Sequence, residues 1–149
     1  MGYLTEKVAY LKGLADGMKI DDSTNEGKLF ANILDVLEDW GCNIDEGLTR
    51  LGDDEDFYKT LLMGFVQENG MKELQAAMKA GDYRRAFEAA HGLKGDTGNL
   101  SLTPLYRAIY ALVEDLRPAY DGSNPSGNPA EDFERVQVLF SEFEEKMGF

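Results

Sequence analysis

The chain has 149 residues, of which 43% are hydrophobic and 29% charged. This is enough apolar material for the core of one domain, so the chain as a whole is not intrinsically disordered. Its 28 acidic against 15 basic side chains give a formal net charge of −13, which disfavours nucleic acid and anionic membrane surfaces as partners. With no run of about 18 apolar residues and no basic-then-apolar leader, we expect a cytoplasmic protein that neither spans a membrane nor is exported.

The chain contains one cysteine, Cys42, and one histidine, His91. A single cysteine cannot form an internal disulfide or, by itself, a zinc site. One histidine and one cysteine in separate segments also cannot assemble a serine hydrolase, a cysteine protease or a two-histidine metal site. No Gly-x-x-x-x-Gly-Lys-Ser/Thr loop occurs, so nothing supports nucleotide-dependent kinase activity. We expect neither a bound metal nor a cofactor.

Residues 1–41 are predicted to form a helical hairpin. Two apolar stripes at helical spacing define its arms. Their members are Leu4, Val8, Leu11, Ala15 and Met18 in the first arm, and Leu29, Ile33, Val36, Leu37 and Trp40 in the second. Ser23 and Glu26, at capping-box spacing, begin the second arm and Gly41 ends it.

Residues 43–81 are predicted to contain a short helix and then a longer one. The short helix starts at Ile44 and is closed by Gly52. The acidic run 53–56 complements the positive end of the next helix dipole, so we interpret it as a helix start rather than a cation site. The apolar stripe of this second helix is Phe57, Leu61, Leu62, Phe65 and Val66. A break or bend is expected at Asn69–Gly70, after which Met71, Leu74, Ala77 and Met78 continue the helix to Gly81.

The remaining chain is predicted to form three more helices. The first starts at Asp82 and carries His91, and the second runs from Thr103 to about Arg117. Residues 118–129, rich in Gly, Pro, Ser and Asn, are the one clear loop, and a last helix holds Phe133, Val136, Phe140 and Phe143. No strand pattern is present. We therefore expect an all-α fold with antiparallel helices.

On a helical wheel of residues 82–100, His91 lies opposite the apolar side. That side carries Ala86, Ala89, Ala90, Leu93, Thr97 and Leu100. The residues three, four and seven positions after His91 are Lys94, Gly95 and Gly98, so they share its exposed surface, as does Arg84 seven positions before it.

Three glycines in this segment, Gly92, Gly95 and Gly98, each cost a helix about 1 kcal/mol relative to alanine. Either the segment is a glycine-rich loop, or small residues leave room for a partner to approach the ring of His91. Helical periodicity favours the second interpretation. A free imidazole titrates at about pH 6.5, so its lone pair is largely available at neutral pH, and an adjacent ammonium suits a phosphoryl acceptor. The alternative to a phosphoryl-accepting role is that His91 is an ordinary surface histidine.

The segment Ala90-His91-Gly92-Leu93-Lys94-Gly95-Asp96-Thr97-Gly98-Asn99-Leu100 resembles the signature of histidine-containing phosphotransfer (HPt) domains, Ala-His-x-Leu-Lys-Gly followed by small residues and Asn-Leu-Gly. The approach to the first bundle helix and the Ala80–Tyr83 segment are also similar, so the resemblance covers about residues 43–149. Three positions depart from the pattern. Ser101 replaces the usual glycine, Asp96 replaces a small residue, and residues 111–113 offer no glutamine.

The resemblance implies an up-down-up-down antiparallel four-helix bundle over residues 42–149, with residues 1–41 as an added hairpin. It implies that His91 is the phosphoacceptor, Lys94 the phosphate counter-charge and Gly95 the access point for a receiver domain. Such a carrier is not an enzyme. It relays phosphoryl groups between receiver-domain aspartates of response regulators, downstream of a hybrid sensor histidine kinase, and the Mg²⁺ belongs to the receiver. Arg84, Gly92 and Gly98 are further binding candidates. We expect a monomer or a weak dimer.

Two other function classes stay open. One is a helical interaction module that binds a response regulator or another signalling protein without phosphate chemistry. The other is a structural adaptor acting through the N-terminal hairpin, with Trp40 or Phe30 partly exposed, although aromatic residues at helical spacing more often belong to a core.

Overall fold

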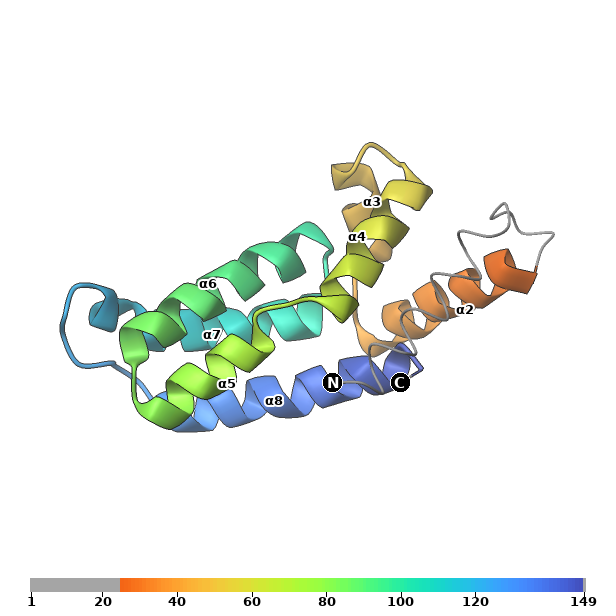
Figure 1. The fold of residues 1–149 in the computed structure, drawn as a ribbon. Coiled ribbons are helices and arrows are strands. Elements are labelled where there is room, and N and C mark those ends of the chain that lie inside the picture. Colours follow the sequence, from red (N-terminus) through yellow and green to blue (C-terminus); the bar gives the residue numbers. More distant parts are fainter. Residues whose placement is uncertain (1–24, 149) are drawn as a thin grey trace.

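A computed structural model describes residues 25–148, in which all regular secondary structure is helical (Figure 1). The helices are α2 (Asn25–Trp40), α3 (Ile44–Arg50), α4 (Glu55–Gln67), α5 (Met71–Ala80), α6 (Tyr83–Asn99), α7 (Thr103–Tyr120) and α8 (Pro129–Lys146). This confirms the all-α fold class. The first arm of the predicted hairpin and the Ser23 cap lie outside the described residues.

Helices α5 to α8 lie side by side and form the body of a helical bundle (Figure 1). Each packs on the next along the chain, and successive helices run in opposite directions because short connections join them. Helices α3 and α4 project from one end of this body, where α6 meets α7 (Figure 1). No helix within residues 25–148 is both long and apolar enough to cross a membrane.

The helix boundaries follow from local capping. The side chain of Asp54 accepts a hydrogen bond from the backbone N–H of Phe57 at 3.0 Å, so the acidic run does begin α4. Asp82 caps α6 in the same way. Between α4 and α5, the Asn69 side chain donates to the carbonyl of Phe65 at 2.8 Å and accepts from the N–H of Met71 at 3.0 Å. The predicted break at Asn69–Gly70 is therefore confirmed.

Part of the predicted apolar face of α2 is wrong. Leu29 and Val36 are both 39% exposed, whereas Phe30 and Leu34 are buried together with the predicted Ile33 and Leu37. The sequence offers two overlapping stripes on this helix, and the one that begins at Phe30 faces the core. Phe30 is thus not available as an exposed adaptor residue.

Two further expectations fail at helix ends. Phe57 is 47% exposed, and the adjacent Tyr58 is fully buried in its place. The Tyr58 side chain faces the core because its hydroxyl donates to the carbonyl of Leu100 at 2.8 Å. Helix α7 continues past Pro118 to Tyr120, so the loop starts at Asp121 rather than Pro118. Burial of Ala119 and the contact of the Tyr120 ring with Phe87 stabilise this last turn although Pro118 lacks an N–H.

Helix α2 is attached to the bundle near the end of α8. The indole N–H of Trp40, which is half-buried, donates to Glu142 at 3.2 Å, and the Trp40 ring lies 6.3 Å from that of Phe143. Leu37 and Phe30 join the same hydrophobic cluster as the bundle residues. The second arm of the predicted hairpin therefore shares the core of the bundle.

Candidate functional site

His91 lies on the exposed side of α6, as predicted. Its neighbours Ala90 and Leu93 are buried, which orients the helix so that His91 faces outward. The imidazole stacks on the ring of Phe87, one turn earlier, with centroids 5.7 Å apart and planes inclined by 14°. This contact supports one face of the imidazole, while the side chain as a whole stays exposed.

Small residues leave the surroundings of His91 open. A Cβ added at Gly92 or at Gly95 would meet no atom within 4 Å beyond the helix's own backbone, so both glycines border empty space. Gly98 is different, because a Cβ there would lie 3.2 Å from the Tyr106 ring. The segment is a helix, and not a glycine-rich loop, so Gly92 and Gly95 weaken it without any packing need.

Lys94, three positions after His91, provides a positively charged side chain on the same helix. Its ammonium lies 4.9 Å from the centroid of the Tyr110 ring on α7, within cation–π range, and the side chain is half-buried. The pKa of nearby Glu114 is lowered, chiefly by a hydrogen bond from Arg117 and to a smaller extent by the charge of Lys94. Lys94 is thus held by α7 rather than extended into solvent.

A groove of about 840 Å³ runs alongside these residues. Its α6 wall includes His91, Lys94, Gly95 and Gly98. Tyr106 and Arg107 of α7 and Glu46 and Arg50 of α3 line it as well. The groove therefore lies where α3, α6 and α7 meet, and most of the side chains that line it carry polar groups.

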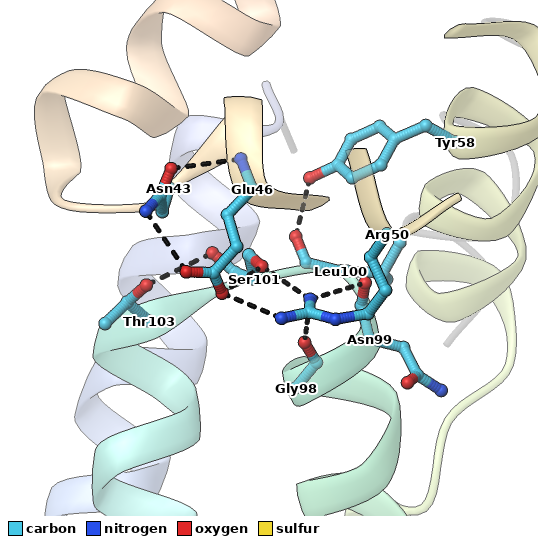
Figure 2. A network of polar contacts seen from close by, with 9 residues as sticks. All are labelled: Asn43, Glu46, Arg50, Tyr58, Gly98, Asn99, Leu100, Ser101 and Thr103. Carbon is cyan, nitrogen blue, oxygen red and sulfur yellow. Dashed lines mark hydrogen bonds and ion pairs between the residues drawn. The ribbon is translucent and has the colours of Figure 1, made fainter. Parts of the chain in front are cut away.

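A hydrogen-bonded network fixes α3 against the α6–α7 junction (Figure 2). The Arg50 guanidinium donates to the carbonyl of Gly98 and to the Ser101 hydroxyl, each at 2.7 Å, and pairs with Glu46 at 2.8 Å. Hydrogen bonds from Arg50 and then Ser101 lower the pKa of the Glu46 carboxyl. The network places one cationic group, the Arg50 guanidinium, on the last carbonyls of α6, where the helix dipole is negative.

Ser101 has φ of +54°, a left-handed conformation in which glycine is favoured. A glycine, which the resemblance in sequence leads one to expect here, would adopt this conformation without strain. Here the buried serine hydroxyl donates to Glu46 at 3.0 Å and accepts from Arg50. The serine thus gains two hydrogen bonds at a position where its backbone conformation is unfavourable.

The predicted site residues divide into two sets. His91, Lys94, Gly95 and Gly98 line one groove. Gly92 lies next to His91 without lining the groove, and Arg84 lies beyond it, with its guanidinium 5.4 Å from the Tyr120 ring.

Sequence reasoning missed Glu46, Arg50 and Arg107. The i,i+4 spacing of Glu46 and Arg50 on a short helix was an available signal for an ion pair, but not for its contact with α6. Asp96, which departs from the HPt pattern, lines a separate hollow with Thr60 and Gly64 of α4 and does not line the His91 groove. Burial raises the pKa of its carboxyl.

Metal binding and thiol chemistry find little support in the described part of the chain. Within residues 25–148, no group of three or more His, Cys, Asp or Glu side chains is placed to hold a metal ion. Cys42 is buried, and this burial raises the pKa of its thiol to about 12, so it is a poor nucleophile.

The chain matches no protein-family model, no curated protein and no solved structure.

Proposed function

We propose that this protein is a histidine-containing phosphotransfer carrier, which accepts a phosphoryl group on His91 and passes it between receiver-domain aspartates in a two-component phosphorelay. The observation that carries the proposal is an exposed imidazole on a helix whose neighbouring glycines border open space. The resemblance of residues 90–100 to the HPt signature supports the same function.

The chemistry requires one nucleophilic nitrogen and free access to it. The lone pair of the unprotonated ring nitrogen attacks the phosphorus of an aspartyl phosphate on the donor receiver. The P–O bond to that aspartate breaks, its electron pair leaves on the carboxylate, and the other ring nitrogen keeps its proton. The return step is the same reaction in reverse, onto a second receiver. The Mg²⁺ for both steps belongs to the receivers, and the carrier has no kinase activity of its own.

Neighbouring groups have supporting roles in this proposal. Phe87 restrains the ring by stacking, which limits the orientations that a docking partner must select. Lys94, held on Tyr110, offers an ammonium to the added phosphate charge. Gly95 leaves the space through which a receiver reaches the imidazole. The donor in such a relay is a hybrid sensor histidine kinase, and we place the carrier in the cytoplasm.

The test is phosphoryl uptake from phosphorylated receiver domains by the wild type and by His91→Gln. We expect a label on the wild type that is lost in acid and survives base, as is typical of phosphohistidine, and no label on His91→Gln. Circular dichroism should show that both chains are equally helical, because His91 is exposed. Lys94→Gln should slow uptake, whereas Lys79→Gln, an exposed lysine on α5, should not.

A label on His91→Gln equal to that of the wild type would contradict the assignment of His91. No label on the wild type from several donors would favour the alternative, a helical module that binds signalling proteins without phosphate chemistry.

A further inference from the structure

The surface around His91 is basic, although the whole chain carries a net charge of −13. From Tyr83 to Tyr120, the two helices that flank the groove and the turn between them contain five Lys or Arg and four Asp or Glu residues. Four of those cations are Arg84, Lys94, Arg107 and Arg117, which we call the basic face.

Aromatic rings support three of these four cations. The guanidinium of Arg84 lies 5.4 Å from the Tyr120 ring, and that of Arg117 lies 5.5 Å from the Phe87 ring. Phe87 in turn stacks on His91, and its ring lies 5.4 Å from that of Tyr120. Lys94, three positions after His91, rests on Tyr110 of α7. Arg84 and Arg117 are thus linked to His91 through Phe87, and all three cations lie along the contact between α6 and α7.

Arg107 completes the basic face from within the groove. It lines the groove together with His91 and Lys94, and its side chain is exposed. Neither Arg107 nor Arg84 forms an ion pair with any residue in the described part of the chain. Two positive charges are therefore left without an ion-pair partner in that part of the chain, one inside the groove and one further along α6.

The acidic residues of these two helices neutralise only part of the basic face. Asp96 lines the separate hollow next to α4, and Asp115 lies against the residues that lead into α8. Glu114 pairs with Arg117 at 2.8 Å, and Glu88, an exposed carboxylate three positions before His91, lies on the same helix face. Four cations against these two carboxylates leave the balance on the face positive.

We infer that the basic face is a docking surface for a partner protein whose contact surface is acidic. This inference rests on the proposed function and names the kind of receiver that the site accepts. The positive face complements an acidic partner in charge, whereas the strongly negative chain as a whole would repel one. Cations held on rings lose less side-chain freedom on binding than freely extended ones, and Arg and Tyr are typical residues of protein interfaces. The partner's acidic groups contact Arg84 and Arg107, on either side of His91, and orient it over the imidazole.

The test uses a synthetic decaglutamate peptide as the acidic probe and the full chain labelled with ¹⁵N. We expect amide shifts centred on α6 and α7 around His91, and an affinity that falls steeply between about 50 and about 200 mM NaCl. Arg84→Gln and Arg107→Gln should each weaken binding about two- to fivefold, the effect of one exposed ion pair, and the double variant should lose more. Arg135→Gln, an exposed arginine on α8, is the matched control and should bind as the wild type does.

Affinities of Arg84→Gln and Arg107→Gln equal to that of Arg135→Gln would overturn the inference. Shifts that map away from α6 and α7, or no binding at low salt, would also overturn it. Peptide binding needs no phosphoryl group. Failure to label His91 therefore counts against the proposed function alone, while unchanged peptide affinity in the arginine variants counts against the docking surface alone.

Discussion

Substitutions of Gly95 test whether this glycine lowers stability in order to keep the surface beside His91 open. It lies inside α6, where glycine is about 1 kcal/mol less favourable than alanine. A Cβ at this position would meet no atom within 4 Å, so Gly95→Ala adds no clash. We expect Gly95→Ala to raise the free energy of unfolding by about 1 kcal/mol, which corresponds to a rise of about 2–4 °C in Tm for a domain of this size.

The same surface predicts the opposite effect on function. Gly95→Leu is also compatible with the helix, but its side chain occupies the space through which a receiver would approach His91. A displacement of about 1 Å of the reacting groups costs about a hundredfold in rate, so we expect phosphoryl uptake from a receiver domain to fall by about that factor. The assay is uptake rate together with thermal unfolding of the same samples.

Gly64 is the matched control for this pair of effects. It lies inside α4, its added Cβ would also meet nothing within 4 Å, and it does not line the His91 groove. Gly64→Ala and Gly64→Leu should therefore match the Gly95 variants in stability and the wild type in uptake. The reasoning is refuted if Gly95→Ala is less stable than the wild type, or if Gly95→Leu accepts phosphate at the wild-type rate.

Two further predictions concern packing and pH. Gly47→Ala should lower the free energy of unfolding by about 1–3 kcal/mol in urea titrations, because the added Cβ would lie 2.9 Å from the buried Tyr58 ring and 3.0 Å from the carbonyl of Leu100; unchanged stability would mean that α3 shifts freely. Burial and then the neighbouring Asp132 raise the pKa of Asp115 to about 6. Because the native state binds this proton more tightly than the unfolded chain does, stability falls as pH rises from about 4 to about 6, and Asp115→Asn should flatten this part of the stability–pH curve and stabilise the protein at pH 7. A curve of unchanged slope in that variant would assign the dependence to other groups.

The helices could be predicted because their signals are local. Asp82 and Gly81 mark the junction between α5 and α6 by capping chemistry that operates within a few residues. The outward direction of His91 follows from the periodicity of Ala90, Leu93 and Thr97 in the same way. Such signals require no knowledge of the tertiary structure.

The misses arise where tertiary packing decides between local alternatives. Tyr58 and Phe57 are adjacent aromatic residues, and only the buried hydrogen bond from the Tyr58 hydroxyl to the carbonyl of Leu100, 2.8 Å long, shows which one enters the core. Arg50 and Gly98 are 48 positions apart in sequence, so nothing local predicts that α3 forms a wall of the His91 groove. Arg107 joins the site only because α6 and α7 pack together.

The location of Trp40 determines what the protein's own fluorescence can report. It is the only tryptophan in the chain, and it contacts Glu142 and Phe143 where α2 meets α8. Its emission depends on whether its ring is covered and its N–H is bonded, so quenching by a neutral solute such as acrylamide measures how firmly α2 is attached. His91 and Lys94 lie on α6, whereas the Trp40 signal reports the contact between α2 and α8.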